Sequence, residues 1–161
     1  MNDKYAISDE KTVARILHSD WVVADKLQLG AFTLRTNETY ISVNRPLVSS
    51  FASDVSSFVS SHPSYQYTEN TYRCAMLSVK DIRGIEVSYK GESVNIDVEV
   101  KPRPTIIASH AGIFSRIGMT NIKQGVTLPA TALPVGLSVD DVLMEIEWTL
   151  IALSTIEEKK I

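Results

Sequence analysis

The sequence predicts an α+β fold in which a mainly antiparallel sheet is flanked by two or three helices. Three observations lead to this fold class. Apolar and polar residues alternate over 94–101, as in a strand with one buried face. Apolar residues follow helical spacing over 50–61 and again after Ser138. No internal repeat or linker divides the 161 residues, so we expect a single domain over 1–161.

The N-terminal part is expected to contain one short helix and one hairpin. Val13, Ile16 and Leu17 have i, i+3, i+4 spacing after an acidic stretch, which predicts a helix over 10–18. Between residues 30 and 45 apolar and polar positions alternate on both sides of a polar triplet. This pattern predicts a hairpin whose turn lies at that triplet.

A serine-rich segment follows and is also expected to be helical. Eight of the sixteen residues at 49–64 are serine, which resembles the composition of a linker. However, Phe51, Val55 and Val59 lie on one helical stripe, and the serines occupy the other faces. We therefore predict a helix over 50–61 that ends before Pro63.

The middle of the chain is expected to form strands. Segments 72–79, 85–90 and 94–101 are rich in Val, Ile and Tyr, and the sequence Lys-Gly-Glu-Ser between the last two supplies a tight turn,. A Pro-Arg-Pro sequence then ends the third strand. Frequent Gly and Pro residues over 105–137 predict loops and short strands there rather than long elements.

Ser138 is expected to cap a C-terminal helix, because an acidic residue follows three positions later in the manner of a capping box,. The buried stripe of this helix would consist of Val142, Leu143, Ile146, Leu150, Leu153 and Ile156. Lys159 and Lys160 suit a helix C-terminus, where cations meet the negative end of the dipole. Trp148, Thr149 and Ile151 are also compatible with a strand, so the end of this element stays open.

The composition restricts the functional classes. A net charge of −3 disfavours a general nucleic-acid-binding protein, which usually has a basic excess. No apolar run reaches the ~18–20 residues that span a bilayer, and the first residues lack the pattern of a signal peptide. Cys74 is the one cysteine and is expected to be a buried, unreactive residue. We therefore expect a soluble, cytoplasmic protein without membrane contact.

Charge is segregated along the second half of the chain. Residues 100–139 contain no acidic residue but include Lys101, Arg103, Arg116 and Lys123, whereas residues 140–161 hold six acids and two lysines. A basic stretch with many glycines is suited to bind an anion such as phosphate. The alternative is that the basic loop only faces the acidic helix or the solvent. The ligand-binding candidates are Arg103, Arg116, Lys123 and Arg45.

His110 is the first candidate for a catalytic residue, since it lies among small residues in the basic segment and imidazole titrates near neutral pH. His18 is the second candidate, and a joint site of the two would supply a proton-transfer pair. A single histidine is more often structural. The chain has no zinc-ligand spacing, phosphate-binding loop or dinucleotide fingerprint, so no metal and no cofactor are expected.

Two short segments carry a resemblance. The sequence Ser-Val-Asn-Arg at 42–45 and the sequence His-Ala-Gly-Ile at 110–113 resemble segments of small bacterial proteins with no assigned activity. The resemblance implies no catalytic role. It only strengthens the case for His18, Asn44, Arg45 and His110 as candidate functional residues.

Three functions remain open at this stage. The first is a binding or accessory protein without catalytic activity, which acts with a protein partner or a phosphate-containing small ligand. The second is a small enzyme that acts on a phosphate-containing substrate through His110. The third is a nucleic-acid-binding module that uses the basic residues of 101–123, and the acidic total of the chain argues against it.

Overall fold

The computed structural model describes residues 6–103 and 107–161 and has an α+β fold. Its main sheet has eight strands among the described residues, in the order β11-β10-β4-β1-β6-β12, with β9 beside β10 and β5 beside β6. Each of these pairings is antiparallel. The strands are β1 (Thr12–Ile16), β4 (Ile41–Asn44), β5 (Gln66–Thr68), β6 (Thr71–Ser78), β9 (Ile96–Pro102), β10 (His110–Ile117), β11 (Thr120–Asn121) and β12 (Thr155–Lys160).

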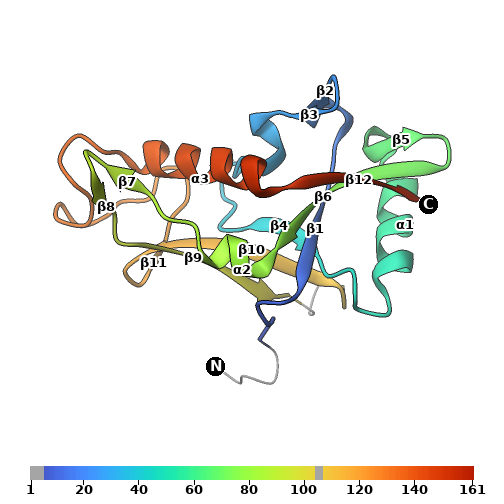
Figure 1. The fold of residues 1–161 in the computed structure, drawn as a ribbon, viewed down its shortest axis with the longest axis horizontal. Helices are drawn as coiled ribbons and strands as arrows, with labels where there is room; N and C mark the ends of the chain where they lie inside the picture. The colour runs from blue at the N-terminus through green and yellow to red at the C-terminus, as the bar shows by residue number, and fades with distance from the viewer. Residues whose placement is uncertain (1–5, 104–106) are drawn as a thin grey trace.

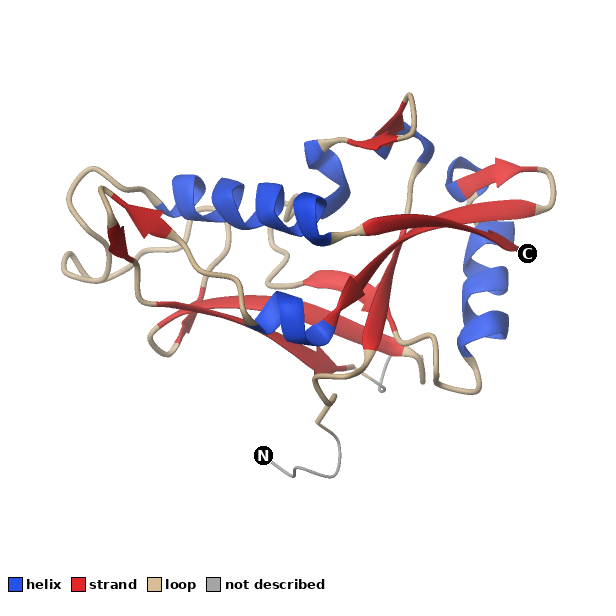
Figure 2. Cartoon of the chain, in the orientation of Figure 1, coloured by secondary structure: helices blue, strands red, loops and turns tan. Residues whose placement is uncertain are grey.

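The α-helices are α1 (Phe51–Ser61), α2 (Val79–Arg83) and α3 (Val139–Leu153). Figures 1 and 2 show α3 and α1 toward opposite ends of the molecule, with β12 leading from the end of α3 toward the α1 end. Two small hairpins pair β2 (Val22–Val23) with β3 (Lys26–Leu27) and β7 (Ser88–Tyr89) with β8 (Glu92–Ser93). Short 3-10 helices are η2 (Ser19–Trp21), η3 (Leu29–Phe32) and η4 (Pro63–Tyr65). In the described part of the chain, no helix is both long and apolar enough to cross a bilayer.

The sheet is buried on both faces because alternate residues of its strands enter two different cores. On β1, Val13 packs in the larger core with α3, whereas Ala14 and Ile16 pack in a smaller core with α1. On β6, Leu77 and Cys74 separate in the same way. The predicted burial of Cys74 is confirmed.

The predicted helix over 10–18 is wrong, because Thr12–Ile16 forms strand β1. All five residues of β1 pair with β6, from Thr12 opposite Ser78 to Ile16 opposite Cys74. With both faces buried, the strand is apolar at neighbouring positions, and this run happens to contain helical spacing. Sheet pairing therefore decides the structure against the local pattern.

The predicted hairpin over 30–45 is also wrong. Its first half contains the 3-10 helix η3, and its second half contains β4, which pairs with β1 and β10. Ala31, Phe32 and Leu34 are buried in the larger core. They are held by packing there rather than by pairing with β4.

The central strands were predicted in part. Segment 72–79 corresponds to β6, and segment 94–101 largely to β9, whereas only Ser88–Tyr89 of segment 85–90 is a strand. The predicted tight turn is present, with positive φ at Lys90 (51°) and Gly91 (82°), as a two-residue hairpin turn requires. The loops expected over 105–137 are wrong at β10, an eight-residue strand. Its residues are buried on both faces, so its sequence has no alternation to reveal it.

The two long helices were predicted correctly at their starts. Phe51, Val55 and Val59 of α1 are buried. The capping box of α3 is formed, since Ser138 and Asp141 exchange side-chain hydrogen bonds with each other's backbone N–H. The expected C-terminal end is wrong, because α3 stops at Leu153 and the chain continues as β12, which holds Ile156, Lys159 and Lys160. Pairing of all six β12 residues with β6 explains the change.

Candidate functional site

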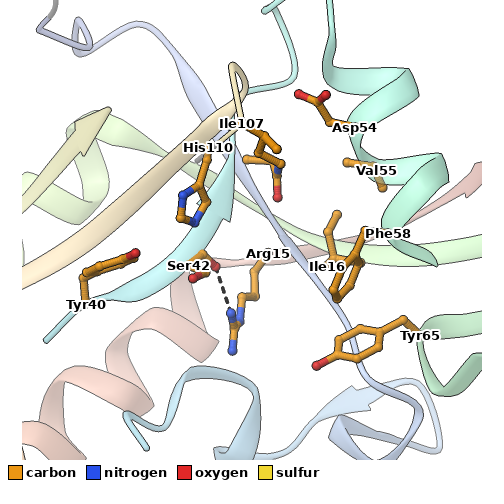
Figure 3. A pocket seen from close by; sticks show the side chains of 11 residues that line it. Arg15, Ile16, Tyr40, Ser42, Asp54, Val55, Phe58, Tyr65, Ile107 and His110 are labelled. Carbon is orange, nitrogen blue, oxygen red and sulfur yellow. Dashed lines mark hydrogen bonds between the residues drawn. The ribbon is translucent and has the colours of Figure 1, made fainter. Parts of the chain in front are cut away.

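A cavity of about 360 Å³ lies between α1 and the strands β1 and β4 (Figure 3). Its volume is within the range of ~300–1,000 Å³ that is usual for small-molecule sites. The lining residues come from β1, from β4 and the residue before it, from α1, from η4, from the start of β10 and from Ile107 ahead of β10. They are Arg15, Ile16, Tyr40, Ser42, Asn44, Asp54, Val55, Phe58, Tyr65, Ile107 and His110.

The sheet opens at this place because β1 and β4 pair at Ala14 and Asn44 only. Beyond that pair, Arg15 extends between the two strands. Its Nε donates to the carbonyl of Ala31 at 2.9 Å, and its Nη1 donates to the carbonyl of Ser42 at 2.9 Å. Arg15 therefore bridges β4 and η3 where the β1–β4 ladder has ended.

The charge of Arg15 is not neutralised by a carboxylate. Its guanidinium forms no ion pair with an acidic group of the described residues, and it packs 4.8 Å from the ring centroid of Trp21. Burial lowers the pKa of Arg15 to about 10, against a weaker opposing effect of Tyr65 and Glu38. The side chain is thus still cationic at neutral pH. Its Nη2 makes no hydrogen bond to a described residue, and Arg15 is one of the residues that line the cavity.

His110 begins β10 opposite Asn44, and its ring points into the cavity (Figure 3). The residue is 8% exposed. Burial, followed by the positive charge of Arg103, lowers the pKa of His110 below its usual value of 6.5. The imidazole is therefore neutral at pH 7. Its Nδ1 is buried and has no hydrogen-bond partner among the described residues.

Asp54 places a negative charge at the α1 side of the cavity. Its Oδ2 accepts hydrogen bonds from the hydroxyl of Ser50 at 2.8 Å and from the backbone N–H of Ser109 at 3.2 Å. Hydrogen bonds from Ser109 and Ser50 lower the pKa of this carboxyl, so it is ionised at neutral pH. The same contacts join α1 to the segment just before β10.

The rest of the wall is mainly apolar and aromatic. Ile16, Val55, Phe58 and Ile107 supply the apolar surface, and Figure 3 shows the hydroxyl of Tyr65 turned toward the Arg15 side. One region of the cavity thus has a cation and hydroxyl groups, and another has apolar side chains with Asp54 nearby.

His18 occupies a different place. Its Nδ1 accepts a hydrogen bond from the backbone N–H of Asp20 at 3.0 Å and so caps η2. Its ring packs against Trp21 and Tyr65, with centroid distances of 5.6 and 5.1 Å. His18 lines a second pocket of about 140 Å³. Tyr65 lines both this pocket and the main cavity. The two candidate histidines, His18 and His110, therefore line different pockets, and Tyr65 is the lining residue that these two pockets have in common.

None of the four predicted ligand-binding cations lines the main cavity. Arg103 lies beside one of the lining residues, with its guanidinium 5.0 Å from the ring centroid of Tyr40. Arg45 lines a separate pocket. Arg116 lies on β10 opposite Asp97 of β9, and Lys123 follows β11. The structure thus brings Arg103 near His110 but does not bring the four cations together in this cavity.

The sequence patterns missed Arg15, Tyr40, Asp54 and Tyr65 as site residues. One signal was present for Arg15, which is the single charge in the apolar run Val-Ala-Arg-Ile-Leu. A charge in such a run is either paired or directed at a cavity, because burying it without compensation is costly. For the two tyrosines and Asp54 no comparable signal exists in the sequence.

Two further features of the described residues bear on the chemistry of the cavity. No hydroxyl, thiol or carboxylate of the described residues hydrogen-bonds to the His110 ring, so a nucleophile–base pair is not formed there. In the described part of the chain, no group of three His, Cys, Asp or Glu residues is placed to hold a metal ion. The chain matches no protein-family model, no curated protein and no solved structure.

Proposed function

We propose that this chain is a small-molecule binding protein that holds the anionic group of its ligand on Arg15. One observation carries the proposal: the guanidinium of Arg15 is largely surrounded by protein, lacks a carboxylate partner among the described residues, and faces a cavity of ligand size. Removing a charge from water without a partner is strongly unfavourable. A carboxylate or phosphate on Nη2 would supply the missing partner through charge-assisted hydrogen bonds.

The surrounding groups support binding of an anion as well. His110 and the hydroxyls of Tyr40, Ser42 and Tyr65 are hydrogen-bonding groups on residues that line the same cavity. Arg103, behind Tyr40, adds a second positive charge nearby without entering the cavity. These groups favour a small ligand that carries one anionic group.

The test is ligand binding to the wild-type chain and to an Arg15→Met variant, measured by thermal shift and calorimetry. A ligand at about 100 times its Kd stabilises a fold by about 2.7 kcal/mol. We expect small carboxylates or phosphate monoesters to stabilise the wild type and not Arg15→Met. Arg45→Met is the matched control, because it removes the same charge outside this cavity.

Loss of binding in Arg15→Met with retention in Arg45→Met supports the proposal, provided that circular dichroism shows both variants folded. Binding of anions that is equal in all three proteins contradicts it. Because Arg15 also supports the β1–β4 gap, Tyr65→Phe serves as a milder variant. It removes one hydroxyl from the cavity and should weaken the same ligands without loss of fold.

A second candidate function is a small enzyme that uses His110 as a general base on a phosphate-containing substrate. The observation in its favour is that a neutral imidazole and Arg15 face the same cavity. A positioned base contributes about 10²–10⁴-fold to a rate. Any hydrolysis of a phosphate ester by the wild type should therefore fall by that factor in His110→Gln. A rate unaffected by this substitution contradicts the enzymatic function.

A further inference from the structure

We infer that the ligand of the α1–β1–β4 cavity is an amphiphilic monocarboxylic acid rather than a phosphate ester. The inference rests on the proposed anion site at Arg15 and specifies its ligand class. It follows from three features of the cavity: the number of cations that reach it, the position of Asp54, and the nature of the surface around the two charges.

The first feature is that, in the part of the chain that the structure describes, one guanidinium lines the cavity. Arg15 is the single Lys or Arg among the described lining residues. Arg103 is not one of the lining residues, and its guanidinium lies 5.0 Å from the ring centroid of Tyr40. A phosphate monoester carries a charge of about −1.5 to −2 near neutrality and three acceptor oxygens, whereas a carboxylate has one charge and two oxygens. The single positive charge of the Arg15 guanidinium matches the single negative charge of a carboxylate.

The second feature is the carboxylate of Asp54 on the α1 side. Its Oδ2 accepts hydrogen bonds from Ser50 and from the backbone N–H of Ser109, and these contacts hold the carboxylate in its place in the cavity wall. As an ionised group in the wall of the cavity, it repels a second negative charge on the ligand,. A dianion is therefore disfavoured relative to a monoanion of the same shape.

The third feature is the apolar surface. Ile16, Val55, Phe58 and Ile107 leave room for a hydrocarbon body in the same cavity as the charged site of Arg15. At about 360 Å³ the cavity is near the lower end of the range of ligand pockets,. A compact body such as one aromatic ring with a short chain fits this size better than a long lipid chain.

The hydroxyl of Tyr65 adds specificity for the headgroup. It points toward the side of Arg15 in Figure 3, and its proximity to Arg15 is also reflected in its effect on the pKa of that residue. A carboxylate that receives one hydrogen bond from Nη2 of Arg15 has its second oxygen available for this hydroxyl. Tyr65 is thus expected to act as a residue that selects the headgroup.

The experiment compares ligands that share one phenylpropyl body: 3-phenylpropionate, 3-phenylpropyl phosphate, 3-phenylpropanol and 3-phenylpropylamine, with acetate as the headgroup alone. Trp21 packs on Arg15, so its fluorescence reports on occupancy. The other tryptophan, Trp148, is exposed on α3, and a Trp148→Phe background leaves Trp21 as the single reporter.

We expect 3-phenylpropionate to bind at least about tenfold more tightly than each of the other four probes. Tyr65→Phe should weaken the propionate while leaving the alcohol unchanged. Asp54→Asn should reduce the preference of propionate over phosphate. Asp97→Asn, an exposed site on β9, is the matched control and should leave the preference unchanged.

The outcomes separate this inference from the proposed function. If the phosphate binds as tightly as the propionate or more tightly, and Arg15→Met abolishes that binding, the anion site stands and the monocarboxylate inference is overturned. If no anion of the series binds, or if binding does not depend on Arg15, both fail. A preference for the amine would mean that Asp54, not Arg15, binds the charged group of the ligand. That result would also overturn both the inference and the proposed function.

Discussion

Glu147 on α3 provides a sharp test of the electrostatics of this fold. It is 8% exposed and forms no ion pair with a cationic group of the described residues. It lines an open pocket with Asp140, which lies two turns earlier on the same helix, and with Thr33 and Gln124. Burial, and then the charge of Asp140, raise the pKa of Glu147 to about 7, while the nearby polar side chain of Thr33 opposes the rise.

The sign of the pH dependence follows from the raised pKa. In the unfolded chain Glu147 has its ordinary pKa of 4.5, and in the folded chain about 7. Between these values the folded state holds more protons, so the free energy of unfolding falls as the pH rises through this window. The difference of 2.5, at 1.36 kcal/mol per pKa unit, is an upper limit of about 3 kcal/mol,. Because the pocket is open to water, we expect about 1–2 kcal/mol.

The substitution Glu147→Gln should remove this decrease. The variant is expected to be more stable than the wild type by about 1–2 kcal/mol at pH 8 and to differ little at pH 4.5. The assay is urea denaturation followed by circular dichroism at several pH values. Glu145→Gln, at an exposed position of the same helix, is the control and should retain the pH dependence of the wild type. Equal slopes for Glu147→Gln and the wild type between pH 4.5 and 7 would refute the argument.

Three further changes have defined outcomes. Burial raises the pKa of Cys74 to about 12, so a thiol reagent such as DTNB should react with it only after unfolding; rapid reaction of the native chain at pH 8 would contradict this. In Gly112→Ala the new Cβ would lie 2.6 Å from Cδ2 of Tyr40, so we expect a loss of about 1–3 kcal/mol in denaturation and weaker binding of 3-phenylpropionate. Gly84→Ala, with its nearest neighbour at 3.4 Å, should be near neutral, and equal losses at both glycines would count against a role of Tyr40. Ser138→Ala should destabilise the chain by about 1 kcal/mol through loss of the helix cap, as measured by urea denaturation; an unchanged midpoint would show that the cap contributes nothing.

The accuracy of the sequence-based predictions depends on how each element is buried. Helix α1 has one buried stripe and one wet face, so its period of 3.6 is visible despite the serines. Strands β1 and β10 are buried on both faces, and this removes the alternation by which a strand is recognised. In β1 the resulting apolar run even imitates helical spacing. The errors thus lie in the interior of the sheet, where tertiary pairing decides the structure.

Two of the residues that line the candidate site, His110 and Asn44, were singled out from the sequence, and the other lining residues were not. His110 could be singled out from the sequence because it lies among small residues in the basic segment and because imidazole titrates near neutral pH. Arg15, Asp54 and Tyr65 come from β1, α1 and η4, and their convergence depends on how α1 packs against the sheet. The basic segment of 101–123 illustrates the converse. Its cations are close in sequence, yet Arg103 and Arg116 lie at opposite ends of β9 and β10 in the paired sheet.

Arg15 connects the stability of the sheet with the proposed binding site. Its Nε and Nη1 satisfy the carbonyls of Ala31 and Ser42 where β1 and β4 have separated, and its third nitrogen remains for a ligand. Removing a partner from a buried acceptor costs about 1–3 kcal/mol, whereas removing the uncompensated charge is favourable. Arg15→Met should therefore change stability by less than the loss of two hydrogen bonds would suggest, while it abolishes anion binding. If Arg15 only stabilised the sheet, the results would be reversed. Arg15→Met would lose much stability, and anions would stabilise neither the wild type nor the variant.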